Sequence, residues 1–321
     1  MWKAAAMTAL PLALAQRLKL PLIAAPMLTV SGPDLVVEAC RAGVIGAFPT
    51  KNARTAEELD GWLSDIRARL ADLDGVAAPF CPNLIMRDAR LSEDLACVVR
   101  HRAELVITSV GSPAAAIPAL HDIGCKVLAD VGSLRHAERA MAAGADGLIL
   151  LTAGAGGQTG WLNPFAFVRA VRERFDGIVV LAGGISDGTA LAAARLLGCD
   201  LAYMGTRFIA THESLAAEDY KTMLVASGMD DVVLTSAFSG LPSSMLRPSI
   251  VAAGLDPDNL DESMNAERSR EMYGGGARID GPRRWTGIRS AGHSVSGVRA
   301  VQSVRDLVEQ TLAEYAAAGG T

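Results

Sequence analysis

The sequence predicts an α/β fold: a (β/α)8 barrel of the TIM type, with a small helical lid inserted after the eighth strand. Short apolar runs recur over the first 208 residues, and an amphipathic, alanine-rich stretch follows each run. The runs are continuously apolar, as in strands that are buried on both faces. The eight predicted strands cover residues 21–27, 44–49, 76–84, 105–110, 126–131, 147–153, 178–185 and 201–208.

Helix patterns fill the gaps between these strands. Residues 133–146 begin at Ser133 and residues 187–200 begin at Asp187, and both stretches end near a glycine, which are the usual start and stop signals. An open, doubly wound sheet shows the same alternation of strand and helix. The count stops at eight strands and no antiparallel edge pattern follows, which favours the closed barrel.

The rhythm changes after the eighth strand. Residues 211–280 are polar and helical in pattern and include the start of the glycine-rich stretch "YGGGARIDGPRRW". We therefore expect three parts, given by residue range: a barrel core with the cofactor site (1–210), a helical lid subdomain (211–280), and a C-terminal segment with the final barrel helix (281–321).

Composition limits the class of protein. The chain has 321 residues, half of them hydrophobic, and a formal net charge of −5 without a basic block. Nucleic acids and anionic membranes are therefore not expected as partners. Five scattered cysteines without a CxxC pair indicate reduced thiols in a cytoplasmic protein. No His/Cys/Asp cluster has the spacing of metal ligands, so no metal site is expected.

Glycines gather at the ends of the last three predicted strands, where barrel enzymes carry their active sites. Gly183-Gly184 and Gly205-Thr206 end adjacent strands, and bare backbone there predicts a phosphate-bearing ligand. The loop at 154–160 carries four glycines, which would let a flat group lie against the backbone. No GxxxxGK[ST] loop is present, so a nucleoside triphosphate is not supported.

Four motifs together resemble the nitronate monooxygenase (2-nitropropane dioxygenase) family. They are "IAAPM" at 23–27, "GAGGQTG" at 154–160, "VLAGGISDG" at 180–188 and "AYMGTRF" at 202–208. The resemblance covers about residues 16 to 250 and implies an FMN-containing barrel. Flavin-type enoyl-acyl carrier protein reductases and some NADH:quinone reductases are similar.

The resemblance also implies which residues contact the flavin. Gly183, Gly184, Gly205 and Thr206 would hold its phosphate, while Ala25, Pro26 and Met27 would lie along the isoalloxazine ring. Asn83, Gly156 and Gly157 would complete these contacts. Asp130 is placed either at the ribityl hydroxyls or at the substrate, at a position where many relatives carry a basic residue.

One position departs from the family pattern. The residue after the paired glycines is usually a histidine, and here it is Gln158. A glutamine amide can donate and accept hydrogen bonds but cannot take a proton near neutral pH. We expect Gln158 either to bind a substrate oxygen over the flavin, which makes it the catalytic candidate, or to bond the loop backbone. His212 and His293 are the histidines that could replace the missing base. Trp161 is equally open as packing or as a pocket wall.

Three functions are compatible with these residues. The first is oxidation of alkyl nitronates with O2 through FMN, with poor activity on neutral nitroalkanes. The second is NAD(P)H-dependent reduction of an enone, a quinone or an enoyl thioester. The third is flavin binding without turnover. A small-molecule substrate is common to the first two, and a homodimer is expected by analogy alone.

Overall fold

Eight parallel strands form a closed barrel in the computed structural model, which describes residues 9–73, 75–273 and 283–320. The barrel closes where the last strand pairs with the first, Leu22 opposite Ala202. The barrel strands are β1 Leu22–Ala24, β2 Ile45–Pro49, β3 Phe80–Ile85, β4 Leu105–Ser109, β5 Lys126–Val131, β6 Gly147–Leu151, β8 Ile178–Ala182 and β9 Leu201–Met204. The predicted fold class is confirmed, and each strand lies within or overlaps its predicted run.

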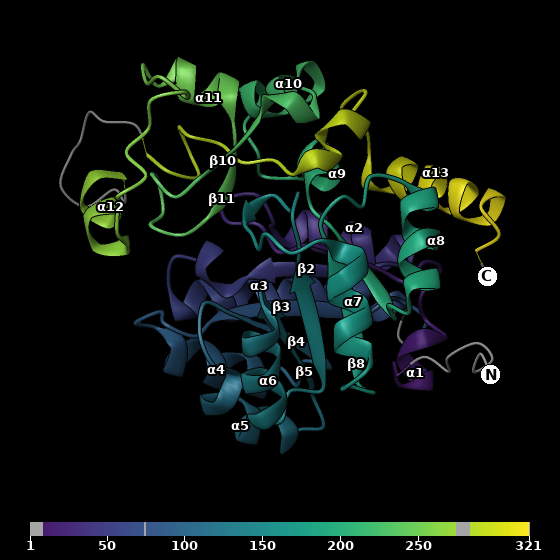
Figure 1. Cartoon of the computed structure of the whole chain (residues 1–321). Coiled ribbons are helices and arrows are strands. Elements are labelled where there is room, and N and C mark those ends of the chain that lie inside the picture. The colour runs from purple at the N-terminus through teal and green to yellow at the C-terminus, as the bar shows by residue number, and fades with distance from the viewer. Residues whose placement is uncertain (1–8, 74, 274–282, 321) are drawn as a thin grey trace.

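Helices surround this barrel (Figure 1). Seven of them follow the strands in turn: α2 Pro33–Ala42, α3 Ala56–Leu70, α4 Leu91–Arg100, α5 Ile117–His121, α6 Leu134–Ala142, α7 Pro164–Arg172 and α8 Gly188–Leu197. The remaining place in the outer wall is filled by α13 (Val304–Ala317), which packs against both α8 and α2.

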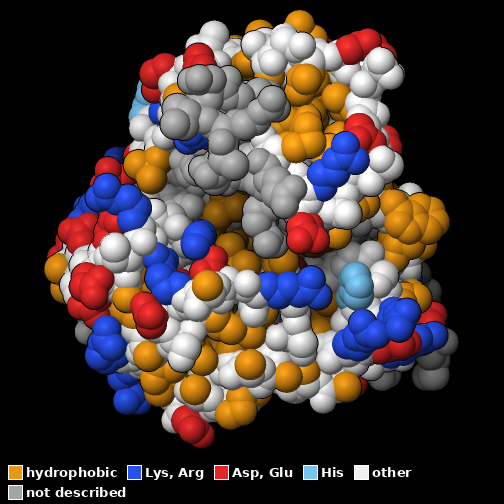
Figure 2. Space-filling view, turned by 90° about the vertical axis from the view of Figure 1, so that its left-hand side faces the viewer, with side chains coloured by type: hydrophobic (Ala, Val, Ile, Leu, Met, Phe, Trp, Pro, Cys, Tyr) orange, Lys and Arg blue, Asp and Glu red, His pale blue; other side chains and the backbone are white. Residues whose placement is uncertain are grey.

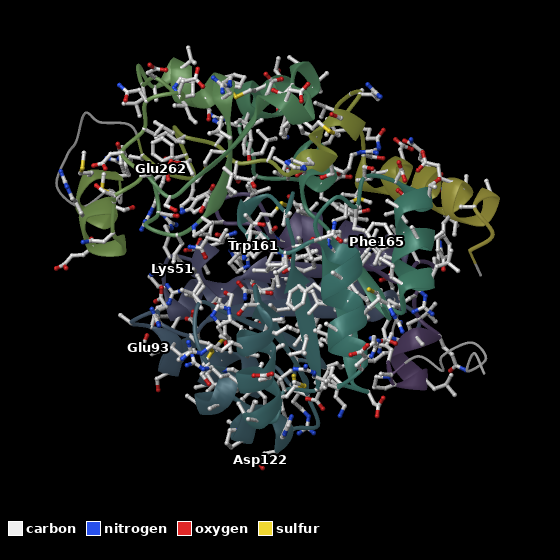
Figure 3. All side chains as sticks on the ribbon, viewed as in Figure 1. Lys51, Glu93, Asp122, Trp161, Phe165 and Glu262 are labelled. Atoms are coloured by element: carbon white, nitrogen blue, oxygen red, sulfur yellow. The ribbon has the colours of Figure 1, made fainter. Side chains whose placement is uncertain are left out.

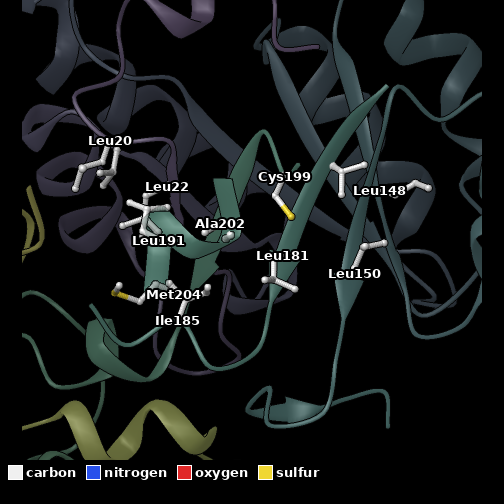
Figure 4. Packing of buried hydrophobic residues seen from close by; sticks show 14 of the residues in the cluster. Leu20, Leu22, Leu148, Leu150, Leu181, Ile185, Leu191, Cys199, Ala202 and Met204 are labelled. Carbon is white, nitrogen blue, oxygen red and sulfur yellow. The ribbon is translucent and has the colours of Figure 1, made fainter. Parts of the chain in front are cut away.

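Both faces of the strands are apolar, because one face fills the barrel interior and the other packs against the helices. Ile23, Ile149 and Val180 point into the barrel, and their neighbours along each strand point outward to the helices. Outward-facing Leu148, Leu181 and other members of this layer are fully or almost fully buried beneath the helices (Figure 4). Burial on both sides accounts for the continuous apolar runs in the sequence.

The short helix α1 (Leu12–Ala15) covers the N-terminal end of the barrel. Leu10 and Leu14 pack with the residues that fill the barrel interior. The Ala9 amide donates to the carboxylate of Asp200, which immediately precedes β9. The opposite end, where the strands finish, is therefore the end that remains for a ligand.

A mixed region lies over that opposite end (Figure 1). It begins after the short helix α9 (Thr206–Ile209) and contains α10 Glu218–Ala226, β10 Val232–Thr235, β11 Ser243–Leu246, α11 Arg247–Ala252 and α12 Ala266–Tyr273. A purely helical lid was expected, and the structure shows strands in it as well. Ile288 packs with Phe238 and Met245, so this region continues past residue 283. Most of the glycine-rich stretch, residues 274–282, lies outside the described residues.

The two strands of this region join a third from the barrel. β7 (Gly157–Gln158), in the loop after β6, pairs antiparallel with β11 and makes the sheet β10–β11–β7. The loop that the sequence marked as a run of bare glycines is thus tied to the region above the barrel. Among the described residues, no helix is long and apolar enough to span a bilayer.

Candidate active site at the barrel mouth

The floor of the barrel mouth is polar, although the interior below it is apolar. Side chains alternate along a strand, so Asp130 points inward like Leu128, two residues before it. Tyr203 of β9 and Cys81 of β3 belong to the same interior layer, and both carry an electrostatic interaction with Asp130. The sequence did not single out Tyr203, yet alternation from the buried Leu201 would have placed it here.

Asp130 is the least satisfied group on this floor. Its Oδ1 atom is buried and makes no hydrogen bond within the described part of the chain. Burial raises the pKa of this carboxyl from 3.8 to about 7, because the charged form is separated from water. Buried polar atoms are normally paired. An orphaned carboxyl oxygen at the mouth therefore fits a ligand that brings its own hydroxyl groups.

Free backbone amides mark the ends of β8 and β9. Among the described residues, the N–H groups of Gly184, Gly205 and Thr206 have no acceptor. Gly184 has a φ of +74°, and no heavy atom lies within 4 Å of the position that its Cβ would occupy. The Thr206 hydroxyl accepts from the Gly292 amide at 3.0 Å, which leaves its own N–H available. Such donors suit a phosphate.

The loop after β1 approaches the same strand ends. A Cβ on Gly205 would lie 3.5 Å from both the Ala25 Cβ and the Met27 Sδ, in ordinary contact. The Met27 amide donates to the Ser31 hydroxyl at 3.0 Å, and the Met27 carbonyl accepts from Asn52 at 2.9 Å. Ala25, Pro26 and Met27 therefore form a fixed wall beside Gly205.

Asn83 is on the floor but is already bonded. Its Nδ2 donates to the Ile107 carbonyl at 3.3 Å and to the Ser109 hydroxyl at 3.1 Å. These bonds connect β3 to β4. The predicted flavin contact of Asn83 stays a prediction.

Gln158 is held by its backbone and free at its side chain. It lies opposite Ser243 in the β7–β11 pair. Its side-chain amide makes no hydrogen bond within the residues that the structure describes. The alternative in which this amide bonds the loop backbone is therefore not seen, and the side chain remains available to a ligand.

The neighbouring glycines have a packing role. A Cβ on Gly156 would lie 2.7 Å from the Gly292 amide nitrogen, and one on Gly154 would lie 2.8 Å from His293 Nδ1. The His293 amide also donates to the Gly154 carbonyl at 2.9 Å. Close approach of the backbone at Gly292 explains why Gly156 lacks a side chain, and the His293 side chain occupies the space beside Gly154. Their predicted role against a flat ligand is not tested by this contact.

The nitronate monooxygenase family model matches residues 87–314, well over half of the sequence. The chain belongs to this family. A nitronate monooxygenase of Paraburkholderia phytofirmans is 28% identical over 280 residues, covering 74% of this chain and 76% of the relative.

Other relatives carry names that differ from nitronate monooxygenase. A Mycobacterium tuberculosis "(3aS,4S,5R,7aS)-5-hydroxy-7a-methyl-1-oxo-octahydro-1H-indene-4-carboxyl-CoA dehydrogenase" is 28% identical over 72% of this chain, and the match spans 64% of the relative's length. Among solved structures, FabK from Thermotoga maritima superposes with a TM-score of 0.80 at 27% identity, covering 94% of each chain. Nitroalkane oxidase from Streptomyces ansochromogenes gives 0.76 at 26% identity, over 96% and 99%. These relatives make the chain an oxidoreductase of flavin-enzyme type.

The two candidate histidines have different surroundings. A cavity of about 150 Å³ is lined by Trp161, Leu234, Ser244 and His293 among others. Ser244 follows Ser243, the partner of Gln158, so the two serines point to opposite faces of the sheet. His293 and Gln158 therefore lie on opposite faces. His212 is exposed, and its backbone pairs with Gln302. Trp161 is 77% exposed at the rim of the cavity (Figure 3).

Backbone strain at the mouth was not foreseen from the sequence. Thr29, Val110 and Trp285 have φ values of 62°, 54° and 69°, in the left-handed region that non-glycine residues seldom adopt. The Thr29 hydroxyl donates to the Trp285 carbonyl at 3.2 Å, which connects the β1 loop to the upper region. Strained residues concentrate at functional sites. Figure 2 shows a hollow between the barrel and the upper region, with hydrophobic side chains in its floor.

Proposed function

We propose that this chain binds FMN at the barrel mouth and oxidises alkyl nitronates with O2. The observation that carries the proposal is the set of free amides at Gly184, Gly205 and Thr206, because it supplies a phosphate cradle in a chain of this family. Bound FMN would supply the redox chemistry, taking electrons from the substrate and giving them to O2.

The residues of the mouth divide the binding of FMN among them. The three amides and the turn at Gly183 hold the phosphate. Asp130 accepts a hydrogen bond from the ribityl chain, which satisfies its orphaned Oδ1. Pro26 and Met27 lie along the ring, on the wall fixed by Asn52 and Ser31.

Gln158 accounts for the choice of substrate. Its amide donates a hydrogen bond to an oxygen of the nitronate and stabilises the charge on that group as it changes during reaction. The amide cannot remove a proton from carbon, and His293 lies on the other face of the sheet. The substrate is therefore the nitronate anion, and neutral nitroalkanes react poorly.

Anaerobic mixing of the FMN-loaded protein with one reductant at a time tests this proposal. Propyl nitronate should bleach the flavin within the turnover time, and admission of O2 should restore the colour. 1-Nitropropane at the same concentration and pH should bleach it much more slowly.

The same experiment distinguishes the other functions. Bleaching by NADH or NADPH and not by propyl nitronate would replace the proposal with a reductase. Bound flavin that no donor bleaches would indicate a binding protein. A preparation that takes up no FMN from excess would refute the cofactor itself.

A further inference from the structure

Three side chains with metal-ligating atoms meet on the outer wall of the barrel. Asp60 lies near the start of α3, while Cys97 and His101 lie four residues apart at the end of α4. Residues at this spacing share one face of a helix. Asp60 Oδ1, Cys97 Sγ and His101 Nε2 all lie within 4.8 Å of one another, and we name these residues the α3–α4 cluster.

Two separations between ligand atoms of the α3–α4 cluster are near those around a tetrahedrally coordinated ion. Asp60 Oδ1 lies 3.7 Å from Cys97 Sγ and 2.9 Å from His101 Nε2. Zn²⁺ with ordinary bonds to sulfur, nitrogen and oxygen holds these ligand atoms about 3.3 to 3.6 Å apart. The Asp60 and His101 atoms would have to move apart by about 0.5 Å to reach that geometry.

We propose that the α3–α4 cluster binds a borderline-soft divalent cation, Zn²⁺ above all, and that this ion joins α3 to α4. Thiolate, imidazole and carboxylate together form a ligand set typical of zinc. The Cys97 side chain is fully buried, whereas Asp60 is 43% exposed. The ion enters from the Asp60 side, and water takes the fourth position.

Binding replaces the proton of the Cys97 thiol with the ion. The zinc–sulfur bond forms as that proton leaves to solvent, and the carboxylate and the neutral imidazole supply the other electron pairs.

Arg100 is the built-in competitor for the ion. Its guanidinium donates to the same Asp60 Oδ1 at 2.8 Å, and its side chain is 62% exposed. The ion must displace this cation, and the exposed side chain has room to turn into solvent. Removing Arg100 should therefore strengthen metal binding. If the cluster were only an ion-pair network, the same change would merely weaken the contact between α3 and α4.

Metal titration of the full chain tests the proposal. Chelator-stripped protein should bind one Zn²⁺ in competition with a chromophoric chelator and unfold at a higher temperature, and EDTA should reverse both effects. With Co²⁺ the protein should show the near-ultraviolet charge-transfer absorption of a thiolate ligand. Absence of that absorption would exclude Cys97 as a ligand and overturn the site.

Variants separate the cluster from adventitious binding. Cys97→Ser and His101→Gln should each lose more than about 100-fold in Zn²⁺ affinity, the upper range for residues that only support a ligand. Cys40→Ser, at another buried cysteine, should lose nothing. Arg100→Ala should bind severalfold tighter. His101→Gln keeps the test intact if the buried serine prevents folding.

Equal Zn²⁺ affinity in the wild type, Cys97→Ser and His101→Gln would refute the site. Weaker Zn²⁺ binding by Arg100→Ala than by the wild type would also refute the site. The proposed flavin chemistry is independent of this result, because the cluster lies on the outer wall and the FMN site at the barrel mouth. Asp60→Asn should therefore abolish the zinc effect and leave the FMN content unchanged.

Discussion

Gln158 is positioned by its main chain. Pairing of β7 with β11 fixes the backbone opposite Ser243, and no partner for the side-chain amide is found among the described residues. The group can therefore turn to a ligand without breaking any bond of its own. It offers hydrogen bonding and no acid–base chemistry.

Gln158→Ala should lower kcat/KM for propyl nitronate by about 100-fold, the usual loss on removing a donor to a developing charge. FMN affinity should stay within about twofold, because the phosphate cradle is elsewhere. Oxygen uptake and a flavin titration measure the two quantities. Gln158→His is the converse variant and should gain activity on 1-nitropropane. Unchanged turnover in the alanine variant would remove Gln158 from the mechanism.

Asp130→Asn should stabilise the flavin-free protein at pH 8 and leave its stability at pH 4 unchanged. The carboxyl has a folded pKa near 7 and an unfolded value of 3.8. Folding therefore favours the protonated form, and the wild type loses stability as the pH rises between these two values, on the order of 1 to 4 kcal/mol in all. Above pH 7 the penalty is constant.

Urea unfolding of both proteins across this pH range measures the effect. If the unfolding free energies of the two proteins changed in parallel with pH, Asp130 would have a hydrogen-bond or charge partner in solution. Asp130→Asn should also retain some FMN, because an amide oxygen still accepts a hydrogen bond from a hydroxyl.

At the scale of the elements, glycines set how closely segments approach. A Cβ on Gly188, at the start of α8, would lie 2.1 Å from the Tyr315 amide nitrogen of α13. The Gly188 amide also donates to Glu314 at 3.0 Å. The helix that completes the outer wall comes closest to the α8 backbone where this glycine has no side chain.

Gly188→Ala should destabilise the protein by at least about 2 kcal/mol, because the added methyl group meets backbone that cannot move aside. Gly61→Ala is the matched control. Gly61 is an exposed glycine inside α3 with no atom within 4 Å of its Cβ position. Alanine there should raise the free energy of unfolding by at most about 1 kcal/mol. Chemical denaturation of the two variants compares them. Equal effects would contradict the close packing of α8 and α13.

The ends of β8 and β9 should distinguish FMN from riboflavin. Riboflavin lacks the phosphate that the amides of Gly184, Gly205 and Thr206 are proposed to hold, so it should bind at least about 100-fold more weakly. Fluorescence titration of the flavin-free protein gives both constants. Equal affinities would show that the phosphate lies elsewhere.

At the scale of the molecule, the sequence predicts the barrel well. Strands buried on both faces need continuous apolar runs, and helices need caps, so β5 and β8 and the helix starts at Ser133 and Asp187 could be located from local pattern. The end of the barrel that carries the glycines followed from the fold class alone.

Other features depend on contacts between distant residues, and no local pattern encodes them. Gly157 and Gln158 have no strand propensity, and they become β7 only because β11 lies beside them. The missing partner of Asp130 and the bond between Thr29 and Trp285 arise from folding. Asp60 is likewise brought to Cys97 and His101 only by the packing of two helices, so sequence spacing alone could not reveal this grouping.

The outer wall of the barrel is finished by a segment that follows the whole upper region. α13 covers apolar positions on α2 and α8 that were made more than a hundred residues earlier. A nascent chain that has reached only residue 300 thus leaves these apolar positions of α2 and α8 exposed, even when all eight strands have formed. Ribosome-bound intermediates of this protein should depend on chaperones until α13 has been made and has packed in place.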